Sequence, residues 1–302
     1  MKKNTQNSKT IFAPAKINLF LHITGRRQNG YRKLDSLVCF ADIGDTIHIE
    51  TADHFSFHIT GSFADQFSDT EKESHTDSQN LVVRAARMLS QITKTPLTCK
   101  ITLEKNLPIA AGVGGGSSDA AAVIWGLQRL WGISHDTDFL LPFLTQIGAD
   151  VPVCYHAQSC IMQGIGDVIL PAPNMPEIPI LLVNPMIFCP TERVFMNHNN
   201  VYKSPLTLPD NIQTIFSLVD ILKTTSNDLY APAQQSAPEI SNVISALGGQ
   251  PQTLLSRMSG SGATCFGIYE TLQDAQNAHD AIAKDNPDWW LATGHLNTIE
   301  RY

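Results

Sequence analysis

The feature that most constrains this chain is a glycine-rich segment, A-G-V-G-G-G-S-S-D-A-A-A, at residues 111–122. Four of the five residues from Gly112 to Gly116 are glycine, and without Cβ atoms their N–H groups can approach an anion closely. Helix-forming residues follow, so we expect a helix at 118–131 whose unpaired N–H groups and positive dipole end face the loop. The segment therefore predicts a phosphate site, with hydroxyls from Ser117 and Ser118. A plain turn capped by Ser118 is the weaker alternative, because a turn rarely needs four glycines.

The segment differs from the better-known glycine motifs. A P-loop, G-x-x-x-x-G-K-[ST], needs a lysine after its last glycine, and Ser117 stands there. The dinucleotide motif G-x-G-x-x-G fails at the same residue, and the acidic residue about twenty positions on, Asp136, begins a helical pattern and does not end a strand. Since H-R-D and D-F-G are absent from the sequence, protein-kinase machinery is excluded as well.

Composition sets the class of protein. The 302 residues are 43% hydrophobic and 16% charged, which is a globular composition, and the length suits two domains better than one. A net formal charge of -7 argues against a general affinity for nucleic acid or an anionic membrane surface. Any anionic ligand must therefore be held by a local site.

The positions of the cysteines and lysines bear on metal binding and on the cellular location of the protein. The six cysteines are scattered without a C-x-x-C pair, which predicts reduced, buried thiols and no protein-bound metal. No apolar run approaches the ~18 residues of a membrane span. Lys16 and Asn18 interrupt the apolar segment behind the N-terminal lysines, so a signal peptide is not expected and the predicted location is the cytoplasm.

Hydrophobic periodicity predicts an α+β fold. A strand is expected over 11–23, with Lys16, Asn18, Phe20 and His22 on the face opposite an apolar one. Other expected strands are 46–50, 55–60, 100–107, 178–183, 263–269 and 289–293, with a turn at Asn29-Gly30 and a hairpin at 159–170. Residues 61–80 are expected as a surface loop, and helices at 81–91 (capped by Asp77, Ser78 or Asn80), 136–146 and 272–284. The proline-rich segment 170–176 divides the chain into two expected domains, 1–172 and 173–302.

Three segments together resemble the motifs of the GHMP kinases. They are P-x-x-x-G-x-G-G-G-S-S at 108–118, A-P-A-K-I-N-L at 13–19, and S-G-S-G-A-T at 259–264, in the family's order. The resemblance implies a ribosomal-S5-domain-2-like nucleotide-binding domain followed by a ferredoxin-like domain that contributes to substrate binding. It also implies ATP with Mg²⁺ as phosphate donor, and a third segment that folds against the active site.

Three motifs together indicate one branch of the superfamily: A-P-A-K-I-N-L-x-L, an N-G-Y at 29–31 and G-A-D-V-P at 148–152. Their combination resembles the branch that phosphorylates the 2-hydroxyl of 4-diphosphocytidyl-2-C-methyl-D-erythritol in the non-mevalonate isoprenoid pathway. The alternatives are another GHMP kinase with a mevalonate- or homoserine-type acceptor, or a nucleotide-binding regulator that has lost catalysis. A monomer or weak homodimer is expected.

The resemblance also assigns site residues. Asp150 is implied as the catalytic aspartate that accepts or orients the hydroxyl proton, and Lys16 as its cationic partner. Implied nucleotide-binding residues are Asn80, Lys105, Pro108, Ile109, Ala110, Ala111, Gly112, Val113, Gly114, Gly115, Gly116, Ser117 and Ser118. Implied substrate-binding residues are Asn18, Tyr31, Arg32, Thr191, Phe195 and Gly260. Arg32 departs from the histidine common at its position, and a guanidinium cannot accept a hydrogen bond as neutral imidazole can.

Overall fold

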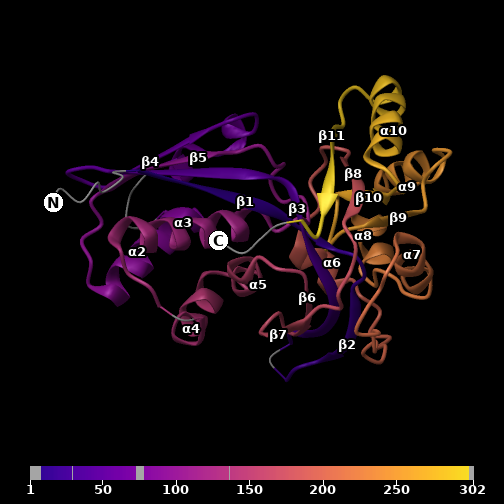
Figure 1. Ribbon diagram of the computed structural model, residues 1–302, viewed down its shortest axis with the longest axis horizontal. Helices are drawn as coiled ribbons and strands as arrows, with labels where there is room; N and C mark the ends of the chain where they lie inside the picture. Colours follow the sequence, from indigo (N-terminus) through magenta and orange to yellow (C-terminus); the bar gives the residue numbers. More distant parts are fainter. Residues whose placement is uncertain (1–7, 29, 73–77, 136, 299–302) are drawn as a thin grey trace.

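The computed structural model describes residues 8–28, 30–72, 78–135 and 137–298. Asn29 of the expected turn, Asp77 as a possible cap and Asp136 as a helix start lie outside these residues. The described strands form one 11-stranded sheet, in which the order along the main path is β4-β5-β3-β11-β8-β10-β9 (Figure 1). The strands are β1 (Ser8–Asn18), β2 (His22–Arg26), β3 (Arg32–Thr51), β4 (Ser56–Thr60), β5 (Cys99–Glu104), β6 (Cys160–Gly164), β7 (Val168–Pro171), β8 (Ile178–Asn184), β9 (Leu255–Met258), β10 (Cys265–Ile268) and β11 (Trp290–Leu296).

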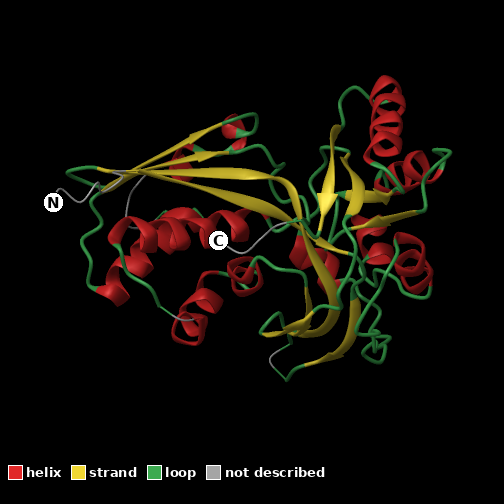
Figure 2. Cartoon of the chain, in the orientation of Figure 1, coloured by secondary structure: helices red, strands yellow, loops and turns green. Residues whose placement is uncertain are grey.

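The 20-residue strand β3 organises the molecule. It pairs antiparallel with β1, β2, β5, β6 and β11, and only β4 and β5 among the described pairs run parallel. Figure 2 shows the long strands of the first half running into the shorter strands of the second half. The sheet therefore continues from one half of the chain to the other.

Helices cover the sheet in two groups. The helices are α1 (Asp69–Lys72), α2 (Leu81–Thr93), α3 (Gly115–Trp131), α4 (Thr137–Ile147), α5 (Val151–His156), α6 (Thr191–Met196), α7 (Ile215–Lys223), α8 (Tyr230–Ser236), α9 (Ile240–Gly248) and α10 (Leu272–Asp285). In Figure 1, α2 and α3 lie beneath β1, β3, β4 and β5, and α7 to α10 surround the strands of the second half. Within the described residues no helix is both long and apolar enough to cross a bilayer.

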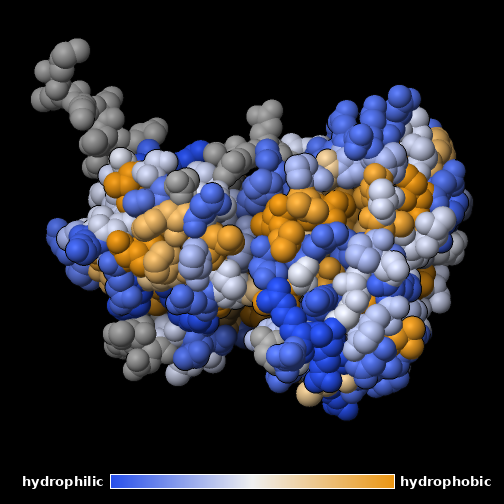
Figure 3. Space-filling model, turned by 90° about the horizontal axis from the view of Figure 1, so that it is seen from below, coloured by the Kyte–Doolittle hydropathy of each residue, from blue (hydrophilic) through white to orange (hydrophobic). Residues whose placement is uncertain are grey.

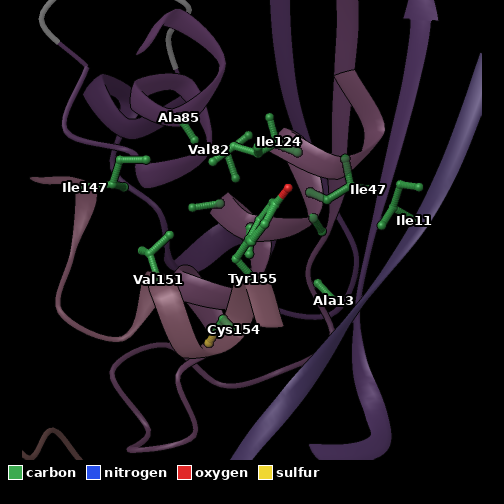
Figure 4. Close-up of a cluster of buried hydrophobic side chains, with 14 of the residues drawn as sticks. Ile11, Ala13, Ile47, Val82, Ala85, Ile124, Ile147, Val151, Cys154 and Tyr155 are labelled. Atoms are coloured by element: carbon green, nitrogen blue, oxygen red, sulfur yellow. The ribbon is translucent and has the colours of Figure 1, made fainter. Parts of the chain in front are cut away.

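One hydrophobic core lies between α2–α5 and the first strands (Figure 4). At its centre the ring of Tyr155 stacks on Trp125 with 4.7 Å between ring centroids, and the Tyr155 hydroxyl accepts a hydrogen bond from Gln128 at 3.0 Å. This packing fixes α5 against α3. The two helices whose N-termini carry the predicted site residues are therefore held as one rigid unit.

Most expected elements are confirmed, and the differences have local causes. The expected strand 11–23 is wrong in its middle: β1 ends at Asn18, and β2 begins at His22. Leu21 instead exchanges backbone hydrogen bonds with Ser226 (3.0 Å) and Asp228 (2.8 Å), and Phe20 and His22 are buried like the apolar residues opposite them. α3 begins three positions early, at Gly115, because the glycines themselves are helical.

Two further expectations need correction. The expected strand 46–50 is only the end of β3, whose earlier part is interrupted in sequence by polar residues such as Asp35, Ser36 and Asp45. These residues are buried and hydrogen-bonded, so their polarity does not end the strand. The expected loop 61–80 contains the 3-10 turn Ala64–Gln66 and the short α1. The six cysteines are buried free thiols, as predicted, and the division at 172/173 stays a prediction.

Candidate active site

A β-bulge turns Lys16 toward the glycine-rich segment. β1 changes register against β3 between Pro14 and Lys16, and the Lys16 N–H donates to the carbonyl of Val113 at 2.8 Å. The Lys16 side chain is buried, and its ammonium donates to Asn18 Oδ1 at 2.9 Å and lies 3.4 Å from Asp150 Oδ2. Lys16 and Asn18 therefore lie side by side, and their binding of one ligand stays a prediction.

Asp150 occupies the N-cap position of α5 without capping it. Its side chain makes no cap hydrogen bond to the helix, and 38% of it is exposed, against 4% for its partner Lys16. A carboxylate that makes no cap hydrogen bond to its helix and is partly exposed can accept a proton from a ligand. Lys16 and Asp150 therefore form an ion pair in which the lysine is buried and the aspartate is partly exposed.

Asn18 is fixed from two sides. Its Nδ2 donates to Ser36 Oγ at 2.8 Å, and its backbone N–H donates to Ser259 Oγ at 3.2 Å. With its amide oxygen on Lys16, the side chain holds the ammonium in place. Ser36 was missed by sequence reasoning, because it lies on a neighbouring strand and belongs to no local motif.

The glycine-rich segment forms a close turn into α3. Gly114 is the N-cap with φ +64°, and a Cβ there would lie 3.1 Å from the Lys16 side chain. The N-terminal turn of α3 thus begins beside the Lys16 ammonium, where its unpaired N–H groups and dipole favour an anion.

The third segment, 259–264, packs backbone to backbone against the glycine-rich segment. A Cβ on Gly112 would lie 2.6 Å from the carbonyl oxygen of Gly262, and one on Gly260 would lie 2.5 Å from that of Gly112. The Thr264 N–H donates to the Ala111 carbonyl at 3.1 Å. Side chains would separate the two loops, so glycine is required on both sides of this contact.

A buried ionic cluster lies beside the glycine turn. Lys105 Nζ donates to Asp45 Oδ2 at 2.5 Å and to Asp119 Oδ2 at 2.9 Å, and all three side chains are buried. Burial lowers the pKa of Lys105, but attraction to Asp119 and Asp45 outweighs burial and the net pKa is raised. Burial raises the pKa of Asp119, against the opposing effect of Lys105.

Sequence reasoning named Lys105 but not the two carboxylates. Asp119 follows two serines near the start of α3, and this position beside a predicted phosphate site was a usable signal. Asp45 gave no local signal, because it meets Lys105 across 60 positions. Its Oδ1 also accepts the backbone N–H groups of Asn106 at 2.6 Å and Leu107 at 2.8 Å, which fixes the turn after β5.

These groups open into one cavity of about 1070 Å³, roughly the upper end of the size of ligand pockets. Of the predicted site residues, those that line it are Lys16, Asn18, Tyr31, Arg32, Lys105, Pro108, Ile109, Ala110, Ala111, Gly112, Gly114, Gly115, Gly116, Ser117, Asp150, Thr191, Phe195 and Gly260. Asn80, Val113 and Ser118 do not line it. Asn80 caps α2 by accepting from the Val82 N–H at 2.9 Å, Val113 packs in the core, and Ser118 Oγ is buried without a hydrogen-bond partner among the described residues.

Aromatic and hydroxyl side chains line the cavity beside α6. Tyr31 is 58% exposed, and Phe195 is partly buried against the core of the second half. The hydroxyls of Thr191 and Ser261 are 2.8 Å apart, so α6 is tied to the third segment. Apolar residues also gather in patches on the face shown in Figure 3.

The arrangement has the parts that phosphoryl transfer to a hydroxyl needs. The α3 N-terminus can hold phosphate, Lys16 supplies a cation, and Asp150 supplies a carboxylate for the hydroxyl. Within the described residues, no group of three or more histidine, cysteine or acidic side chains could hold a metal ion.

The chain matches two family models and many curated proteins. Residues 80–158 match the GHMP kinases N terminal domain, and residues 222–288 match GHMP kinases C terminal. A 4-diphosphocytidyl-2-C-methyl-D-erythritol kinase of Paramagnetospirillum magneticum is 42% identical over 289 residues, 95% of this chain and 98% of that protein. A protein of the same description from Cereibacter sphaeroides is 43% identical over 290 residues, 94% of this chain and 98% of that protein.

Solved structures show the same fold. A crystal structure of 4-(cytidine 5'-diphospho)-2C-methyl-D-erythritol kinase matches with a TM-score of 0.77 and 27% identity, covering 96% of this chain and all of that chain. A homoserine kinase from Cytophaga hutchinsonii matches with a TM-score of 0.67 at 16% identity over 100% of this chain and 98% of its own. The second match shows the fold alone, which is the α+β GHMP kinase fold predicted from the sequence.

Proposed function

The chain belongs to the 4-diphosphocytidyl-2-C-methyl-D-erythritol kinases of the GHMP kinase family, and from this premise we propose how its cavity works. The enzyme transfers the γ-phosphoryl group of ATP to the 2-hydroxyl of 4-diphosphocytidyl-2-C-methyl-D-erythritol, in the non-mevalonate route to isoprenoid precursors. The observation that carries this is the Lys16–Asp150 pair, 3.4 Å apart, in the same cavity as the N-terminus of α3. The enzyme acts in the cytoplasm, as a monomer or weak homodimer.

The glycine-rich segment would hold the triphosphate of ATP. Its N–H groups at the start of α3 and the open backbone around Gly114 fit an anion. Asp119 would hold the accompanying Mg²⁺, because its Oδ1 is buried without a hydrogen-bond partner among the described residues while its Oδ2 accepts from Lys105. The ion would neutralise phosphate charge when it is bound.

Asp150 would orient the 2-hydroxyl and take its proton as the phosphoryl group moves. Lys16 would stay paired with the carboxylate and face the charge that develops on the reacting oxygens. Asn18 would hold the Lys16 ammonium at the position both tasks require.

The acceptor is tested by comparing substrates in one assay. ADP release is measured with 4-diphosphocytidyl-2-C-methyl-D-erythritol, mevalonate and homoserine at matched concentrations. Turnover is expected with the cytidine compound alone. Turnover with mevalonate or homoserine but not with the cytidine compound would contradict the proposed function.

The role of Asp150 is tested by Asp150→Asn. Removing a general base lowers rates by about 10²–10⁴-fold, so kcat is expected to fall by at least that lower value. The affinity for an ATP analogue, measured by calorimetry, is expected to stay within about twofold, since Asp150 lies outside the glycine turn. Wild-type turnover in the variant would remove Asp150 from the mechanism.

A further inference from the structure

Two arginines face each other across the hairpin of β2 and β3. Arg26 and Arg32 are directly paired in the antiparallel register, and both line the cavity. Side chains in such a pair start about 4.5–5.5 Å apart at Cβ, and like charges placed there repel. A pair of guanidinium groups in this position is favourable only if something offsets the repulsion.

No carboxylate within the described part of the chain forms a salt bridge with either arginine. Arg26 donates from Nε to the Gly30 carbonyl at 3.2 Å. Arg32 uses Nη1 alone, donating to Asn200 Oδ1 and to the Tyr202 hydroxyl, the latter at 3.3 Å. All three acceptors are uncharged.

The neighbouring arginine shows the contrast. Arg27 lies next to Arg26 in sequence and donates to Asp167 at 2.7 Å, so its charge is neutralised within the protein. The chain as a whole carries a net charge of -7, yet the two unneutralised guanidinium groups are placed at the cavity. Their positive potential is therefore local and directed at a ligand site.

Arg32 is also held in position. Asn200, which accepts from it, has a positive φ of 62° and receives a further bond from the Tyr202 hydroxyl at 3.3 Å. Lys203, one residue on, donates its N–H to the Ile23 carbonyl at 2.9 Å, which ties this loop to β2. The loop thus fixes one nitrogen of Arg32 and leaves the Nε–Nη2 edge for another acceptor.

We propose that Arg26 and Arg32 form a subsite for the diphosphate of a nucleoside-diphosphate acceptor. The inference rests on the proposed function and names the part of the acceptor that this end of the cavity recognises. A diphosphate supplies the negative charge that the pair lacks, and the edge of a guanidinium fits two phosphate oxygens. The base would then lie beside Tyr31 and Phe195, which line the same cavity.

Binding of cytidine, cytidine monophosphate and cytidine diphosphate tests the subsite without catalysis. Isothermal calorimetry is performed on the wild type, Arg26→Gln, Arg32→Gln, Arg32→Lys and the double glutamine variant. A charge-assisted hydrogen bond contributes about 1.5–3 kcal/mol, so each glutamine variant is expected to bind the diphosphate about tenfold or more weakly. Cytidine affinity is expected to stay within about twofold, and Arg32→Lys is expected to recover part of the loss.

Lys33→Gln is the matched control. Lys33 follows Arg32 on β3 and carries the same positive charge, but it is exposed and does not line the cavity. It is expected to leave diphosphate affinity and KM unchanged. Thermal unfolding of every variant checks that the fold is retained, and higher salt is expected to weaken diphosphate binding in the wild type more than in the double variant.

Three results would overturn the proposal. Equal weakening of cytidine and the diphosphate in Arg32→Gln would assign Arg32 to the base. Unchanged affinities in the double variant would make both arginines solvated surface charges. A wild type that binds the diphosphate no better than cytidine would exclude the subsite itself. Failure of the proposed function is seen separately, as absence of wild-type turnover with the full acceptor.

Discussion

At the scale of single residues, the buried cluster of Lys105, Asp45 and Asp119 bears most directly on stability. One ammonium group pairs with two carboxylates that have almost no contact with solvent. Removing one partner of a buried pair costs about 3–5 kcal/mol, because the charge left behind has neither water nor a counter-ion. The free energy of unfolding therefore depends on Lys105 much more than on any surface lysine.

Lys105→Met is expected to lower the free energy of unfolding by about 3–5 kcal/mol, measured by urea denaturation. Adding Asp119→Asn is expected to recover part of this loss, since one buried carboxylate is then neutral. Lys203→Met is the control: its ion pair with Asp228 is of similar length, 2.7 Å, but Lys203 is 42% exposed, and Asp228, 9% exposed, keeps hydrogen bonds from the Ile23 N–H and the Ser226 hydroxyl, so a smaller loss than in Lys105→Met is expected. Equal losses in the two lysine variants would contradict the argument.

The same cluster shows how much of the site could be predicted. Lys16 and Asp150 lie in short contiguous motifs, so sequence alone was enough to name them. Asp45 meets its partner only after β3 and β5 have paired, and no local pattern marks that register. The assignment of Asn80 to nucleotide binding stays a prediction, and its side-chain oxygen caps α2, a role the sequence also suggested.

At the scale of elements, the contact between the glycine-rich segment and the third segment controls the shape of the cavity. Gly112 and Gly260 approach each other backbone to backbone, and both have positive φ. A side chain at either position meets backbone atoms, which cannot move aside as a flexible side chain can. The phosphate site and the second half of the chain are therefore coupled by this contact.

Gly112→Ala is expected to weaken ATP binding at least about tenfold, measured by calorimetry, because a Cβ 2.6 Å from the Gly262 oxygen displaces the loop. Gly132→Ala is the matched control. Its φ of +67° is similar to the +74° of Gly112, so both variants carry about 1–2 kcal/mol of left-handed strain, but nothing lies within 4 Å of a Cβ at Gly132. ATP affinity lost equally in both variants would assign the effect to strain alone.

His22, the first residue of β2, links this element to pH. Burial lowers its pKa below the usual 6.5, reinforced by Lys203 and Arg257 and opposed by Asp228 and Asp35. Its Nε2 accepts from the Ser226 N–H at 3.4 Å, and its Nδ1 is buried without a partner among the described residues. A second ring proton, on Nε2, would therefore face the Ser226 N–H group, which cannot accept a hydrogen bond.

Above about pH 6.5, His22 is neutral in both folded and unfolded chains and adds no pH dependence. As pH falls below that value, the unfolded chain binds a proton that the folded chain binds only at lower pH, so the free energy of unfolding decreases. His22→Gln is expected to lose less stability than the wild type between about pH 7.5 and about pH 5.5 in urea denaturation. Because the pKa of His198 is also lowered by burial, some dependence is expected to remain. If the free energy of unfolding falls by the same amount between these two pH values in the variant and the wild type, His22 is excluded as a contributor.

Elements were easier to predict than their extents. The hairpin of β6 and β7 and the helices α2 and α10 have clear periodicity and end at turn or cap residues, so their places were correct. β3 was predicted only at its end, because its buried polar residues are paired by distant parts of the chain that a local pattern does not contain.

At the scale of the whole molecule, the two halves share a core. Ile17 of β1 lies in the same buried cluster as Ile178 of β8 and Phe266 of β10, and β11 pairs with β3 at Ala41. Residues from both sides of the expected boundary at 172/173 thus bury one another. Unfolding either half alone would expose this cluster to water, which is unfavourable roughly in proportion to its apolar area.

The chain is therefore expected to unfold in a single cooperative transition, with equal calorimetric and van't Hoff enthalpies. Phe266→Ala, on the second-half side of the shared core, is expected to cost about 3–5 kcal/mol and to move the whole transition to lower temperature. Exposed Phe216→Ala is the control and is expected to move it little, since half of that side chain is already in water. Two separate transitions, of which Phe266→Ala shifts only one, would show that the halves are stable independently and that the shared cluster does not couple them.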